Sequence, residues 1–150
     1  MIPESCTSIG NYAFHGRLSE TTINIPESVT SIGTGAFWDA DSLVTLRLPS
    51  KVNHILNDTF LHCGNLSTIT WHDNIESIGS DAFRYCGNLK NILIEGKEGN
   101  HLPDLCEVIY NNAFESCGIE QLILNNKLKS IGSRSFYGSR LIETVIPDSV

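Results

Sequence analysis

Hydrophobic and polar positions along the chain recur every 23 residues. The segment 71–94 is one complete period, and most of the chain follows its template: apolar–Pro-x-x-Val-x-x-Ile-Gly-x-x-Ala-Phe-x-x-Cys-x-x-Leu-x-x-Ile-x-apolar. The same interval separates the first residues of consecutive turns, Ile2, Ile25, Leu48 and Trp71. A fixed period of this length predicts a solenoid, in which each turn buries its apolar residues against its neighbours.

Each turn is expected to contain two extended segments and one tight turn. Apolar residues alternate in Leu46-x-Leu48, the period of a half-buried strand, and Val29-x-x-Ile32 is spaced for a short extended stretch. Gly33 is expected to permit a turn that a Cβ atom would hinder. Ala-Phe-x-x-Cys indicates a helical or 3₁₀ turn that places its Phe in the interior. The predicted fold class is an α/β-type leucine-rich-repeat solenoid of about six turns of 22–23 residues. It would carry a parallel β-sheet on one face and short strands, turns and 3₁₀ segments elsewhere.

One turn is lengthened by eight residues. Ile94 precedes Ala113 by 19 residues, whereas Trp71 precedes Ala82 by 11. The extra residues lie within residues 95–104, where two Gly and one Pro are typical of a loop. We interpret residues 1–150 as a single solenoid and a fragment of a longer array, because both ends fall inside a repeat and neither has the composition of a polar cap.

The template resembles the BspA-like, or Treponema pallidum type, leucine-rich repeats. The resemblance is carried by Ile25-Pro-Glu-Ser-Val-Thr-Ser-Ile-Gly-Thr-Gly-Ala-Phe37 and by Ala82-Phe-Arg-Tyr-Cys-Gly-Asn-Leu89, and it covers the chain apart from the inserted residues. It implies an extracellular or cell-surface location and attachment to host matrix proteins or to other cells. The first residues lack the basic and apolar regions of a signal peptide. The expected location therefore depends on the resemblance alone.

Composition excludes several classes of partner. The chain is 41% hydrophobic and 18% charged, as globular proteins are, and its net charge is −7. This charge argues against a nucleic-acid partner, which requires a clustered basic face. No apolar run reaches the roughly 18 residues of a membrane span, so membrane insertion is not expected. The sequence leaves the oligomeric state open.

Catalytic and metal-binding chemistry is not indicated. Cys63, Cys86 and Cys117 share one template position, and Cys6 and Cys106 share another, which predicts small buried core residues. A disulfide between Cys63 and Cys86, on adjacent turns, is the alternative. The five histidines fall at five different template positions, so they do not converge on a metal site. We expect no enzyme, no cofactor and no catalytic or metal site.

The outward residues of the predicted sheet are the first candidates for partner binding. They form a mostly polar ladder: Thr22, Asn24, Thr45, Arg47, Thr68, Thr70, Asn91, Leu93, Gln121 and Ile123. An ordinary solvated sheet would give the same Thr-rich composition.

Two further groups are candidates. The residue after each Phe forms a row, in which Trp38 and Arg84 are of the types enriched in binding hot spots. Trp38 could instead fold back over the edge of its turn. Lys97, Glu98 and His101 belong to the inserted loop, which could project from a binding face or form a neutral surface bulge.

We therefore expect a non-enzymatic, adhesin-like binding module on a rigid scaffold. Its partner would be a protein, possibly a glycoprotein or a matrix component. The alternative is a structural spacer that holds another domain away from the cell surface.

Overall fold

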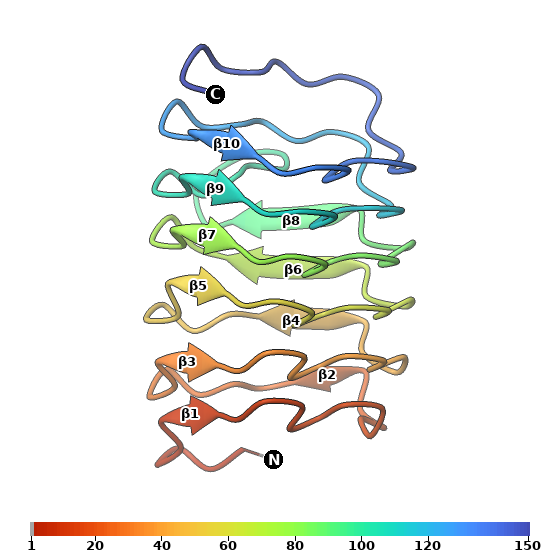
Figure 1. Cartoon of the computed structure of the whole chain (residues 1–150). Coiled ribbons are helices and arrows are strands. Elements are labelled where there is room, and N and C mark those ends of the chain that lie inside the picture. Colours follow the sequence, from red (N-terminus) through yellow and green to blue (C-terminus); the bar gives the residue numbers. More distant parts are fainter. Residues whose placement is uncertain (1) are drawn as a thin grey trace.

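A computed structural model describes residues 2–150 as a solenoid of stacked turns (Figure 1). One parallel sheet contains, in spatial order, β2 (Thr22–Ile23), β4 (Thr45–Arg47), β6 (Thr68–Trp71) and β8 (Asn91–Ile94). On the other side of the turns, β1 (Ser8–Ile9) pairs with β3 (Ser31–Ile32). A second four-stranded parallel sheet there contains β5 (His54–Ile55), β7 (Ser77–Ile78), β9 (Val108–Ile109) and β10 (Ser130–Ile131).

Strand pairing follows the sequence period. Leu46 of β4 lies opposite Ile69 of β6, and Ile69 lies opposite Ile92 of β8. All three side chains are buried, and their neighbours along each strand point outward, as alternation requires. The predicted parallel-sheet solenoid is confirmed.

The α/β part of the predicted fold class is wrong, because residues 2–150 contain no helix. Around Phe60, the amide N–H groups of Asp58, Phe60 and His62 each donate to a carbonyl of the next turn at 2.9 Å. The N–H groups of Leu61 and Cys63 donate three residues back instead. Asp58 and His62 have φ angles of 58° and 59°. A helix would direct every N–H along its own axis, whereas here alternate N–H groups join neighbouring turns.

A column of stacked phenylalanines forms the centre of the core. Consecutive ring centroids are 5.2–5.4 Å apart, with interplanar angles of 1–14°. The column consists of Phe14, Phe37, Phe60, Phe83, Phe114 and Phe136. Trp71, expected in the core, is 2% exposed and packs edge-on against Phe83.

Gly33 is required for a reason other than the predicted one. Its φ is not positive, so no special turn conformation demands glycine. A Cβ atom at Gly33 would instead lie 2.5 Å from the backbone nitrogen of Asn11 in the preceding turn. Close approach of two turns therefore selects glycine at this position.

Candidate partner-binding site

The outward side chains of β2, β4, β6, β8 and residues 121–123 form one surface, here called the strand face. All ten candidates from the predicted sheet lie on it. Exposed members are Thr22, Asn24, Arg47, Asn91, Leu93, Gln121 and Ile123, and half-buried members are Thr45, Thr68 and Thr70. Strand register places the first outward residues of the four strands in one row, and Arg47, Thr70 and Leu93 in a second.

The strand face is nearly free of charge. Arg47 is the only charged residue among its ten members, although 18% of the chain is charged. A shallow hollow of about 290 Å³ surrounds it, lined by Thr22, Ile23, Asn24, Thr45, Leu46, Arg47, Thr68 and Thr70. Depletion of charge is a property of the central part of protein–protein interfaces.

The strand face becomes apolar toward the C-terminus. Leu93 is 38% exposed and Ile123 is 54% exposed. The bridge between Gln121 and Glu143 continues the parallel pairing, so Val145 lies next to Ile123 and extends the row. Val145 was not among the predicted contact residues, because the register after Phe136 is ambiguous in the sequence. A second hollow of about 290 Å³ lies between residues 121–126 and residues 143–147.

The inserted segment is built into the solenoid and interrupts the sheet after β8. His101 forms a parallel bridge with Ile123 in place of the direct pairing between β8 and residues 121–123. The Asn100 side chain joins the two sides of this interruption. Its Oδ1 accepts a hydrogen bond from Ile92 N at 2.8 Å, and its Nδ2 donates to Lys90 O at 2.8 Å and to Gln121 O at 3.1 Å.

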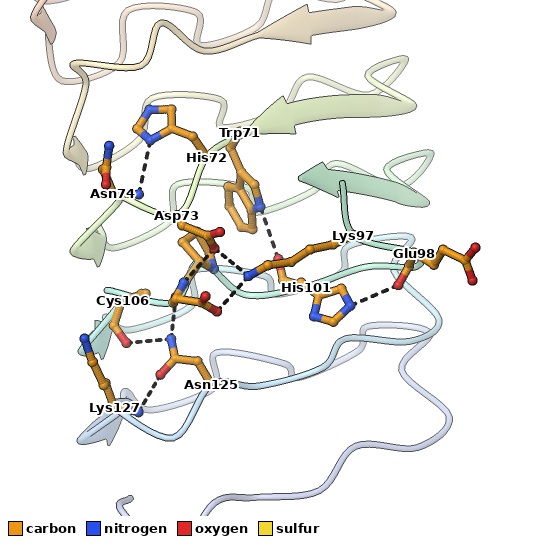
Figure 2. Close-up of polar contacts among 12 residues, drawn as sticks. Trp71, His72, Asp73, Asn74, Lys97, Glu98, His101, Cys106, Asn125 and Lys127 are labelled. Carbon is orange, nitrogen blue, oxygen red and sulfur yellow. Dashed lines mark hydrogen bonds and ion pairs between the residues drawn. The ribbon is translucent and has the colours of Figure 1, made fainter. Parts of the chain in front are cut away.

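Further polar contacts hold the inserted segment in place (Figure 2). Lys97 Nζ lies 2.7 Å from Asp73 Oδ1 and 2.7 Å from Asp104 Oδ1, and Trp71 Nε1 donates to His101 O at 3.1 Å. Burial disfavours the Lys97 cation, but the hydrogen bonds to both carboxylates outweigh it and raise its pKa. Burial likewise opposes the Asp73 anion, but the hydrogen bonds from Lys97 and from Asp104 N outweigh it and lower the Asp73 pKa.

The three candidates from the insert, Lys97, Glu98 and His101, differ in how free they are to bind a partner. Lys97 already forms ion pairs with Asp73 and Asp104, whereas Glu98 is exposed at the tip of the insert. His101 is half-buried, and its Nε2 is 2.9 Å from Glu98 O. Because His101 pairs with Ile123, it joins the strand face, so the structure brings part of the insert and the sheet candidates together.

The row that follows the phenylalanines is not a continuous exposed ridge. Leu61 and Glu115 are buried, and Trp38 is half-buried with His15 stacked on it at 5.0 Å. Arg84 is also half-buried, and its guanidinium donates to Asp81, Tyr85 and Glu115. Sequence spacing located the row but not these contacts, of which those of His15 with Trp38 and of Arg84 with Glu115 arise between turns.

The five cysteines are free, so the disulfide alternative is wrong. Cys63 and Cys86 are fully buried, and their Sγ atoms donate to Phe37 O and Phe60 O. Burial raises the pKa of Cys63, Cys106 and Cys117 to about 12, and that of Cys86 well above its ordinary value. Such thiols are poor nucleophiles. Within residues 2–150, no cluster of three or more His, Cys, Asp or Glu could hold a metal ion.

The repeated turns and the sheet define a leucine-rich-repeat solenoid. The sequence model of the BspA type leucine rich repeat region matches residues 1–100 and 97–150, in 6 copies. The chain therefore belongs to the BspA-type leucine-rich-repeat family. No curated protein matches the sequence. In the part of the chain that the structure describes, no helix is long and apolar enough to cross a membrane.

Solved structures of bacterial proteins share the fold. A leucine-rich repeat protein from Eubacterium ventriosum is 26% identical over 100% of this chain and 38% of its own, with a TM-score of 0.84. The T. pallidum leucine-rich repeat protein is 24% identical over 91% of this chain and 72% of its own, with a TM-score of 0.71. A cell surface protein from Faecalibacterium prausnitzii is 23% identical over 91% and 43%, with a TM-score of 0.64. The chain thus spans well under half of the Eubacterium protein.

Proposed function

We propose that this chain is a non-enzymatic binding module that recognises a protein partner through its strand face. The observation that carries the proposal is a surface of ten aligned side chains with a single charge, on a chain whose net charge is −7. The strands that present these side chains are hydrogen-bonded from turn to turn, so binding requires little ordering of the protein.

An adhesin-like role outside the cell is the finer part of the proposal. It is supported by membership of the BspA-type family and by the description of the Faecalibacterium protein as a cell surface protein. Contacts with individual residues would be modest, and several repeats acting together would supply avidity.

The test compares a blocked strand face with an intact one. Asn91→Arg combined with Gln121→Arg places two bulky cations at exposed positions of the strand face. The control combines Ser31→Arg with Ser130→Arg, two exposed positions on the opposite strands β3 and β10, and gives the same change in charge. Each protein is immobilised and exposed to purified extracellular-matrix proteins and to microbial envelope extracts, and retained proteins are identified by mass spectrometry.

A partner retained by the wild-type protein and the control, but lost from the Asn91→Arg/Gln121→Arg protein, would support the proposal. A partner retained equally by all three proteins would place binding elsewhere. Retention of nothing above background would favour the spacer hypothesis. Circular dichroism of each variant establishes that the fold is intact before binding is compared.

A further inference from the structure

The strand face contains one charged group without a partner. Arg47 lies at the end of β4 and is exposed, and among residues 2–150 no carboxylate lies within ion-pair distance of its guanidinium. Glu27, a nearby carboxylate, is engaged elsewhere, because its Oε2 accepts from Ser50 N at 2.9 Å and from Ser50 Oγ at 2.8 Å. Arg47 is therefore available to an external acceptor.

The side chains around Arg47 add hydrogen-bond donors. Asn24, Thr45 and Thr70 line the same hollow, and none of their side chains forms a hydrogen bond within the described chain. A guanidinium beside hydroxyl and amide groups matches a carboxylate, which accepts several hydrogen bonds at once. None of the other nine members of the strand face is charged, and the nearest charge in the rows that continue it is Glu143, which pairs with Gln121.

An apolar contact lies at a fixed distance from this cation. Arg47 pairs in register with Thr70, and Thr70 pairs with Leu93, so Arg47 and Leu93 lie two strands apart in one row. Strands are spaced by about 4.8 Å, which gives about 10 Å between the two positions. Ile123 is also exposed, but the inserted segment, whose His101 pairs with Ile123, separates it from β8.

We infer that the strand face binds an extended acidic–apolar segment of a protein partner. This segment lies across the strands, presents an Asp or Glu carboxylate to Arg47 and places an aliphatic side chain on Leu93. In the extended polyproline II conformation a chain advances about 3.1 Å per residue and every third side chain lies on the same side, so the two side chains are about three residues apart. The exposed aliphatic groups favour a peptide over an acidic glycan, which carries no aliphatic side chain. The inference depends on the proposed function, whose binding surface it uses.

The test selects peptides from a display library of random dodecapeptides. Selections are run in parallel on the wild-type protein and on Arg47→Gln, Leu93→Asn and Arg140→Gln variants. Arg140 is an exposed arginine outside the ten-residue strand face, so its variant is matched in residue type and charge. The wild-type and Arg140→Gln proteins are expected to enrich peptides in which Asp or Glu lies about three positions from Leu, Ile, Val or Met.

The affinities of one enriched peptide decide whether its carboxylate contacts Arg47. Arg47→Gln is expected to weaken binding about tenfold, and Leu93→Asn by a similar factor. A peptide with Gln in place of its acidic residue should bind the wild-type and Arg47→Gln proteins equally, because the carboxylate has been removed.

The inference is overturned if the enriched peptides lack an acidic residue, if Arg47→Gln has no effect, or if no peptide is enriched. Enriched neutral peptides that are lost on the Asn91→Arg/Gln121→Arg protein would overturn the inference but leave the proposed function intact. Polygalacturonic acid is tested on the same variants. Arg47-dependent binding of this glycan, without peptide enrichment, would assign the hollow to acidic glycans and overturn the inference.

Discussion

At the scale of single residues, two positions in each turn have a left-handed backbone conformation. They lie two residues before and two residues after the stacked Phe, as Asp58 and His62 do around Phe60. Aspartate and asparagine tolerate this conformation better than most side chains. The positions carry different side chains in different turns, so the repeat pattern of the sequence does not reveal them.

Asp58 is expected to be destabilising at neutral pH. Burial, and then the nearby Asp81 carboxylate, raise the pKa of Asp58. Because the folded state binds this proton more tightly than the unfolded state does, stability falls as pH rises through the two pKa values. Asp58→Asn keeps the shape and tolerates the φ of 58°. We expect it to increase the free energy of unfolding at pH 7 by about 0.5 kcal/mol, a small gain because the site is partly solvated. Urea denaturation at pH 7 and at pH 4 should show a smaller gain at the lower pH.

Asp81→Asn is the matched control, with a φ of 57° and the same change in charge. Asp81 Oδ1 accepts from Arg84 Nη1 at 3.0 Å and from Asn112 Nδ2 at 3.3 Å. Its replacement should therefore destabilise the protein. If both substitutions changed stability in the same direction, the environment assigned to Asp58 would be wrong.

At the scale of elements, the inserted segment is the part of the fold that sequence reasoning described least well. The sequence indicates the length and position of the insertion, because the spacing of Ile94 and Ala113 departs from the template. Its composition indicated a loop, either one that projects from a binding face or a neutral surface bulge. The exposed tip fits that description, but Asn100 replaces strand pairing, and residues distant in sequence supply its partners. Local composition does not contain that information.

Asn100→Ala tests this description of the insert. The substitution removes three hydrogen bonds and leaves the Ile92 N–H of β8 without its acceptor. We expect the free energy of unfolding to fall by about 2 kcal/mol, the scale of a lost partner for a buried polar group. Hydrogen exchange at the Ile92 amide should accelerate. Glu98→Ala, at the exposed tip of the same segment, should change neither quantity. Equal effects of the two substitutions would contradict the role assigned to Asn100, whose side chain joins β8 to residues 121–123 by hydrogen bonds.

At the scale of the whole molecule, the sequence predicted the features that recur in every turn and missed contacts that occur at only one point along the solenoid. The period established the buried strand residues and the column of phenylalanines, because every turn repeats the same contacts. The two rows of the strand face followed from strand alternation. The burial of Glu115 did not, because it depends on the arginines of two neighbouring turns, Arg84 and Arg134. The absence of helix was also missed, since Ala-Phe-x-x-Cys fits a helical turn as well as a turn whose alternate N–H groups donate to the neighbouring turn.

The column of phenylalanines makes the position of a substitution along the solenoid decisive. Phe60 is fully buried and stacks on Phe37 and Phe83, whereas Phe136 is half-buried and stacks on Phe114. Phe60→Ala is expected to lower the free energy of unfolding by about 3–5 kcal/mol, and Phe136→Ala by less than half of that. In a solenoid, loss of a central interface also uncouples the turns on either side. Phe60→Ala should therefore decrease the dependence of stability on urea concentration, because fewer turns unfold together, whereas Phe136→Ala should leave it unchanged. Equal costs and an unchanged dependence for both would show that stability is not transmitted along the phenylalanine column.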